Sequence, residues 1–216
     1  MSKKLVIFDL DGTLLDTIGD LAAACNHTLA AHGYPEHPLD RYRLFVGNGM
    51  SKLVERALPP EVRTPEYVER IRGEFVPYYQ EHIAESTRPY EGIPALLEEL
   101  AARGVAVAVA SNKYDEGTRR LIAAFFPGVR FAAVLGQRTG VPTKPDPAIV
   151  NDILCAAGVT REETLYVGDS GTDMRTARNA GVESAGVTWG FRGREELEAE
   201  GADHIVDTPA AIAALV

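Results

Sequence analysis

The sequence feature that most limits the possible folds is an uninterrupted apolar run, Leu5–Phe8, that ends in two acidic residues. A strand with one wet face would alternate polar and apolar residues, so a run without alternation predicts a strand covered on both faces. Asp9 and Asp11 follow the run. Because alternate strand residues point to the same side, their carboxylates can face one pocket. Gly12 then permits a sharp turn, and Thr13 brings a hydroxyl to it.

An Asp-Gly pair between apolar runs is also typical of a β-hairpin turn. A hairpin would continue with alternating apolar residues after Gly12. The apolar residues that follow recur instead at helical spacing, at positions 18, 21, 22, 25 and 29. The segment therefore favours a strand, a turn and then a helix.

The rest of the chain divides into two kinds of pattern. Residues 15–86 read as helices separated by turns, without a strand-like run, whereas strands and helices alternate from Gly92 onward. The strands expected after the first are 105–110, 131–135, 165–167, 184–187 and 204–206. The helices expected between and after them are 94–103, 116–126, 148–157, 174–180, 194–200 and 209–215. Repeated β–α units predict a parallel sheet with helices on both faces. We therefore expect an α/β core of residues 1–14 and 87–216 and an inserted all-helical cap of residues 15–86.

Composition and charge exclude several classes of partner. The net charge of −9 argues against a nucleic-acid or anionic-membrane surface. No apolar run is long enough to cross a bilayer, and Met1–Lys4 leads into the first strand without an apolar leader. Cys25 and Cys155 lack metal-ligand spacing and lie on helical patterns, so we expect both to be small buried residues. These features together predict a cytoplasmic protein.

Polar residues follow three of the predicted apolar strands, where a parallel sheet binds ligands at its carboxyl edge. They are Asp9 and Asp11, Ser111 and Asn112, and Asp169 and Asp173. Four carboxylates gathered at one edge would repel one another unless a cation lay between them. Oxygen ligands of this kind suit Mg²⁺. Lys144, fixed before Pro145 at the start of a helix, could offset further negative charge.

These residues resemble the four motifs of the haloacid-dehalogenase superfamily of phosphatases, in order and at similar spacing. The motifs are Asp9-Leu-Asp-Gly-Thr13, Ser111, Lys144-Pro145 and Gly168-Asp169-Ser170-x-x-Asp173. The resemblance covers the whole chain, including a cap inserted after the first motif. It implies a Rossmann-like sheet with the strands in the order third, second, first, fourth, fifth.

The resemblance also implies a mechanism. Asp9 would attack phosphorus and form an aspartyl-phosphate, while Asp11 would act first as general acid and then as general base. Ser111 and Lys144 would hold the transferring phosphoryl group. Dehalogenases lack an acid two places after the nucleophile, and phosphonate-cleaving members have a small residue there. The acid at position 11 therefore implies phosphoryl transfer to oxygen.

The same resemblance implies that Mg²⁺ is the cofactor. Its ligands would be the Asp9 carboxylate, the Asp11 backbone carbonyl and Asp169, with Asp173 in support.

Within the superfamily, the chain is most similar to phosphoglycolate phosphatases, which implies a small phosphorylated metabolite as its partner. The similarity lies in Val46–Gly49, Ser111–Lys113 and Val187–Arg192. The residues expected to bind substrate are Gly12, Thr13, Gly47, Asn48, Gly49, Asn112 and Lys113. Asn-Gly is equally typical of an ordinary turn, a lysine is often solvated, and Trp189 with Phe191 could simply pack a loop.

Several other functions remain open on the sequence. An inorganic pyrophosphatase shares the cap type, and a sugar-phosphate phosphatase of broad specificity would carry the same motifs. A phosphomutase would have a cap histidine where Leu21 stands. A non-catalytic phospho-acceptor module would have neither a cap nor the acid at position 11. The oligomeric state is also open.

Overall fold

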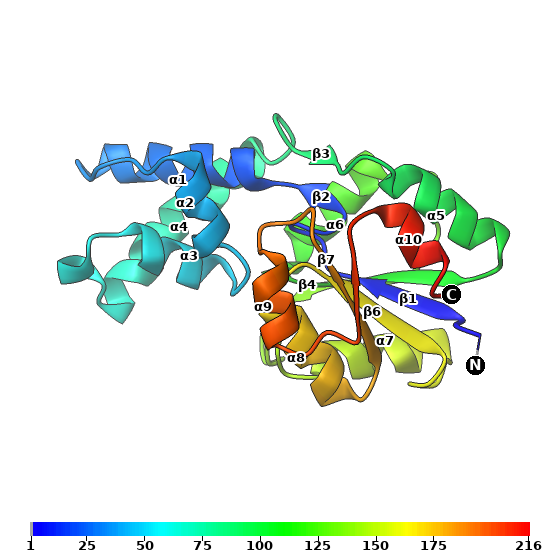
Figure 1. Cartoon of the computed structure of the whole chain (residues 1–216). Helices are drawn as coiled ribbons and strands as arrows, with labels where there is room; N and C mark the ends of the chain where they lie inside the picture. Colours follow the sequence, from blue (N-terminus) through cyan, green and yellow to red (C-terminus); the bar gives the residue numbers. More distant parts are fainter. Residues whose placement is uncertain (1) are drawn as a thin grey trace.

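The computed structural model describes residues 2–216 and contains a six-stranded parallel sheet with helices on both faces (Figure 1). The strand order is β5-β4-β1-β6-β7-β8. The strands are β1 (Leu5–Phe8), β4 (Ala106–Tyr114), β5 (Phe131–Gln137), β6 (Thr164–Gly168), β7 (Glu183–Val187) and β8 (His204–Val206). The strands β5, β4, β1, β6 and β7 follow the predicted order, and β8 extends the sheet at the edge next to β7. The predicted fold class is confirmed.

The position of β1 at the centre of the sheet explains its unbroken apolar sequence. All four of its residues are fully buried between β4 and β6. Val6 and Phe8 pack in the cluster formed with α5 (Ile93–Ala102), α6 (Asp115–Phe125) and α10 (Pro209–Ala213). Leu5 and Ile7 face α7 (Ala148–Ala157) and α8 (Gly171–Ala180) on the other side. A strand covered on both faces has no polar side to present.

A group of helices lies to one side of the sheet, at its carboxyl edge (Figure 1). It consists of α1 (Ile18–Ala31), α2 (Leu39–Phe45), α3 (Met50–Ala57), a short 3₁₀ helix (Pro60–Val62) and α4 (Pro65–Glu81). We call this segment, residues 17–87, the cap. Two short strands join it to the core: β2 (Leu15–Asp16) pairs antiparallel with β3 (Arg88–Pro89). We propose that this ribbon is the boundary between the two domains predicted from the sequence.

Several details differ from the sequence predictions. The segment 15–86 contains β2, which at two residues is too short to produce a recognisable pattern. β4 continues through Ser111–Lys113, which line the cavity, instead of ending at Ala110. Cys25 is buried as expected, but Cys155 is exposed. A small residue on a helix says little about which face it occupies. No described helix, in residues 2–216, combines the length and apolar character needed to cross a membrane.

Asp20, in the first turn of α1, ties the two connections of the cap together. Its carboxylate accepts hydrogen bonds from the backbone N–H and hydroxyl groups of both Ser86 and Thr87. The residue is only 4% exposed. Burial would raise the pKa of Asp20, but these hydrogen bonds together lower it below the ordinary value of 3.8. One ionised group therefore holds the start of α1 to the segment that returns the chain to the core before β3.

We expect Asp20→Ala to lower the free energy of unfolding by about 3 kcal/mol, because several buried hydrogen bonds to a charged acceptor are lost. Urea denaturation would measure this, with Asp40→Ala as the control, since Asp40 is 94% exposed. The pKa of Asp20 is lower when folded than when unfolded. Its stabilisation is therefore complete above the ordinary value of 3.8 and is lost as the pH falls below it. Equal losses in the two variants would contradict this role.

Candidate active site

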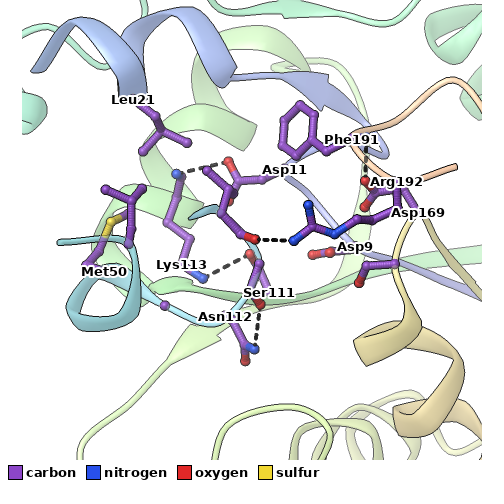
Figure 2. Close-up of a pocket in the computed structure, with 15 residues that line it drawn as sticks. Asp9, Asp11, Leu21, Met50, Ser111, Asn112, Lys113, Asp169, Phe191 and Arg192 are labelled. Atoms are coloured by element: carbon purple, nitrogen blue, oxygen red, sulfur yellow. Dashed lines mark hydrogen bonds and ion pairs between the residues drawn. The ribbon is translucent and has the colours of Figure 1, made fainter. Parts of the chain in front are cut away.

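The turn after β1 presents two carboxylates to one cavity at the carboxyl edge of the sheet (Figure 2). Asp9 is 8% exposed, and its Oδ1 accepts a hydrogen bond of 2.7 Å from the Leu10 N–H. Asp11 Oδ1 accepts a hydrogen bond of 2.6 Å from the Thr17 hydroxyl and lies 2.9 Å from Lys113 Nζ. Each carboxylate is thus anchored through Oδ1 and can use its second oxygen for chemistry.

The turn itself needs glycine at position 12. Gly12 has φ of +87°, and a Cβ at this position would overlap the Asp169 carboxylate. The Thr13 hydroxyl donates to Asp169 Oδ1 at 3.4 Å. Gly12 and Thr13 therefore contact Asp169, and neither residue lines the cavity.

Three carboxylates converge next to this turn. Asp9 follows β1, Asp169 follows β6, and Asp173 lies in the first turn of α8. One oxygen from each lies within 4.8 Å of the others. Asp173 Oδ2 accepts from the backbone N–H and hydroxyl of Ser170, in a capping box that fixes the start of α8. Asp169 Oδ2 accepts a hydrogen bond of 2.7 Å from the Phe191 N–H.

Lys144 supplies the positive charge within this cluster. Its Nζ lies 3.0 Å from Asp9 Oδ1 and 2.7 Å from Asp173 Oδ1. It also donates to the Ala110 carbonyl at 2.9 Å and contacts the Tyr166 hydroxyl at 3.1 Å. The side chain is 2% exposed, so every polar contact of the ammonium is internal.

One ammonium does not balance the buried negative charge. Burial and the charge of Asp173 raise the pKa of Asp9 well above its ordinary value, although Lys144 opposes the shift. Burial and Asp173 likewise raise the pKa of Asp169 to about 7. Burial would lower the pKa of Lys144, but Asp173 and Asp9 outweigh it and raise that pKa. Three clustered carboxylates with excess negative charge are the donor set that a hard divalent cation prefers, so these residues fit a metal site.

The cavity beside this cluster lies between the core and the cap. Its volume is about 30 Å³. Core and cap both contribute to its wall (Figure 2). The predicted residues that line it are Asp9, Asp11, Gly47, Gly49, Ser111, Asn112, Lys113 and Asp169. The other predicted residues, Gly12, Thr13, Asn48, Lys144 and Asp173, lie outside this lining.

The hydrogen bonds of Asn112 and Asn48 hold parts of the site together. The Asn112 side chain donates to the carbonyls of Gly47 and Lys144, both at 3.1 Å, and accepts from the Lys144 N–H at 2.9 Å. Asn48 donates to the Thr172 hydroxyl at 3.3 Å and accepts from Arg56 at 2.7 Å. Both asparagines therefore connect the Gly47–Gly49 loop to its surroundings.

Lys113 is buried beside Asp11 instead of being solvated. It is 2% exposed, and its Nζ donates to the hydroxyl of Tyr79, on α4 of the cap, at 3.0 Å. The ammonium also lies 4.8 Å from the centre of the Tyr79 ring. Lys113 of the core thus holds Asp11, and Tyr79 of the cap holds Lys113.

Sequence reasoning missed part of the cavity wall. Val46, Met50, Leu53, Ser170 and Arg192 also line it. Phe191, considered above only as a packing residue, both packs in the core cluster and lines the cavity. Met50 and Leu53 are three residues apart on a helix, a spacing that also describes ordinary packing. Nothing in the local sequence distinguishes the two uses.

Comparison with known proteins identifies the class. The family model described as haloacid dehalogenase-like hydrolase matches residues 6–187. The chain therefore belongs to the haloacid dehalogenase-like hydrolase family, and the resemblance inferred from the motifs is confirmed.

Individual relatives are similar over nearly the whole chain. A phosphoglycolate phosphatase of Mesorhizobium japonicum is 36% identical over 93% of this chain and 89% of its own length. An N-acetylmuramic acid 6-phosphate phosphatase of Pseudomonas aeruginosa is also 36% identical, over 97% of this chain and 92% of its own. A crystal structure of a predicted phosphoglycolate phosphatase from Haemophilus somnus has a TM-score of 0.91 and 29% identity. That alignment covers 100% of this chain and 98% of the other.

We expect Asp169→Asn to weaken binding of a divalent cation by about 10- to 100-fold, because it removes a charged oxygen ligand from the cluster. Calorimetric titration with Mg²⁺ would measure the affinity. Asp152→Asn is a suitable control, since that carboxylate lies 2.7 Å from Arg138 on the surface, outside the cluster. An affinity unchanged by Asp169→Asn would show that the cation binds elsewhere.

Proposed function

We propose that this protein is a Mg²⁺-dependent phosphatase that hydrolyses small phosphate monoesters, most similar in activity to phosphoglycolate phosphatases. The observation that carries this proposal is the position of Asp9, which lines a cavity between core and cap and lies next to Lys144 and two further carboxylates. Membership of a hydrolase family and the names of the relatives support the same reaction class.

In this proposal Asp9 attacks phosphorus, and the bond from phosphorus to the ester oxygen breaks as an aspartyl-phosphate forms. Asp11 gives its proton to the departing oxygen. It then takes a proton from the water that attacks the aspartyl-phosphate, which returns Asp9 as a free carboxylate and releases phosphate. Lys113 and Thr17 hold Asp11 Oδ1, so Oδ2 is the oxygen available for both transfers.

The remaining residues hold charge in place. Lys144, fixed by four internal contacts, would stabilise negative charge on the phosphoryl group, and Ser111 faces the same cavity. Asp9, Asp169 and the Asp11 carbonyl would hold Mg²⁺, with Asp173 in support. The cation would neutralise charge shared by the phosphate and the carboxylates.

The cavity wall bears on the alternatives. Leu21 lines the cavity at the position where a phosphomutase would need a histidine, and a leucine cannot transfer a proton. Two relatives at 36% identity have different substrate names, so 2-phosphoglycolate and a larger sugar phosphate are both worth testing.

We expect a panel of phosphate esters to show phosphate release that requires Mg²⁺ and is fastest with 2-phosphoglycolate. The panel should include pyrophosphate, β-glucose 1-phosphate and N-acetylmuramic acid 6-phosphate, with chelator as the control. Formation of glucose 6-phosphate would reveal a mutase instead. No phosphate release from any of these compounds would refute the proposal.

We expect Asp9→Asn to abolish turnover and leave the fold intact, because the amide cannot attack phosphorus. Asp11→Asn should reduce kcat by about 10²- to 10⁴-fold, since both proton transfers pass through that carboxylate. The measurements are steady-state kinetics and circular dichroism, with Asp16→Asn as the matched control. Turnover of Asp9→Asn above a few per cent of wild type, with contamination excluded, would remove Asp9 as the nucleophile.

A further inference from the structure

The loop between β7 and α9 (Arg194–Ala199), residues 188–193, lies against the carboxylate cluster. The Trp189 indole N–H donates to the Thr13 carbonyl at 3.1 Å, and the Phe191 N–H donates to Asp169 at 2.7 Å. A Cβ at Gly190 would overlap both Asp169 and the Gly12 carbonyl. The 188–193 loop is therefore fixed in close contact with the catalytic edge of the sheet.

Arg192, in this loop, extends from the core to the cap. Its guanidinium donates to the carbonyls of Arg43, Leu44 and Val46, the last two at 3.5 and 3.0 Å. The side chain is 14% exposed and lines the cavity, where Figure 2 shows it pointing in beside Asp9. On the core side its Nε lies 3.5 Å from a carboxylate oxygen of Glu196.

The acceptors of Arg192 are the unpaired carbonyls at the end of α2, where a helix lacks internal partners and favours a cation. A second arginine, Arg56, donates to the carbonyls of Leu44 and Phe45 at 3.4 and 2.9 Å. Arg56 belongs to the cap and would keep these contacts wherever the cap lies. The contacts of Arg192 exist only while cap and core are together.

These contacts also act on the loop that closes the cavity. Val46, an acceptor of Arg192, directly precedes the Gly47–Gly49 loop, and Gly47 and Gly49 form part of the wall. In return, Arg43 donates across the same boundary to the Gly190 carbonyl at 3.3 Å. The end of α2 and the 188–193 loop are thus joined in both directions.

We propose that Arg192 is a positioning residue that holds the end of α2 and the Gly47–Gly49 loop closed over the reacting groups. It touches neither the phosphoryl group nor the leaving group in this role. Its effect on turnover rests on the proposed function, whereas its effect on closure does not.

The distance between cap and core tests closure without any turnover. One spin label would be placed on Cys155, which is exposed on α7, and a second on the exposed cap position Glu66→Cys. Cys25 is buried, and burial raises the pKa of its thiol to about 12, so it should not react. Pulsed electron paramagnetic resonance would then be recorded in the presence of Mg²⁺.

We expect one narrow distance distribution for the otherwise wild-type pair and a longer, broader one when Arg192→Gln is added. Arg194→Gln is the matched control, because Arg194 contacts Asp207 and Glu198 in the core. That control should leave the distribution unchanged. A distribution that Arg192→Gln does not alter would overturn the proposal.

Steady-state kinetics provides the second readout. Arg192→Gln should raise KM for 2-phosphoglycolate about tenfold, the effect of losing a charge-assisted contact, and change kcat less. Arg192→Lys, which keeps the charge but cannot reach three carbonyls at once, should recover part of the loss. A fall in kcat with KM unchanged would overturn the positioning role. Absence of turnover in the wild type would refute only the proposed function, and the distance measurement would still decide whether Arg192 holds the cap closed.

Discussion

The structure depends above all on how it accommodates excess negative charge at the buried end of β1. Asp9, Asp169 and Asp173 bring their oxygens within 4.8 Å of one another, and Lys144 is the ammonium that contacts two of them. Such a cluster is costly to bury unless each group is paired or hydrogen-bonded. The neighbouring structure supplies those partners: the capping box at Asp173, the Phe191 N–H at Asp169 and the Leu10 N–H at Asp9. The remaining imbalance is the reason why the cluster fits a divalent cation.

The cap forms part of the cavity wall, but the carboxylate cluster and Lys144 belong to the core. The core supplies the carboxylates, which follow β1 and β6 or lie at the start of α8, and Lys144, which lies in the turn between β5 and α7. The cap supplies the Gly47–Gly49 loop and the apolar side chains of Leu21, Met50 and Leu53. The boundary between the two is polar and hydrogen-bonded around the cavity. Polar contacts of this kind can be exchanged for water at small cost. Opening and closing of the cap is therefore compatible with a stable fold.

The residues that would determine the reaction class are therefore different from those that would determine the substrate. The groups that would carry out phosphoryl transfer are held in place by the sheet and by the first turn of the helix that follows β6. The groups that would contact the rest of a substrate lie on cap helices and on the 188–193 loop, where many side chains fit the same backbone. Two relatives that are each 36% identical to this chain are named as phosphatases of different substrates.

The sequence by itself determined the alternation of strands and helices and the family, because these depend on periodicity and on motifs of consecutive residues. The strand order followed from the resemblance to that family, and the helical insertion was predicted from the change in pattern. Asp9, Asp11, Asp169 and Lys144 could be found for the same reason: each lies within a few residues of the end of a strand or the start of a helix. Only the tertiary structure decided that Lys113 pairs with Asp11, that Asn48 joins cap to core, and that Arg192 reaches the end of α2. In each of these contacts, the two residues lie between 102 and 149 positions apart in the sequence. No local pattern encodes such a pairing, since it depends on how segments far apart in the sequence meet.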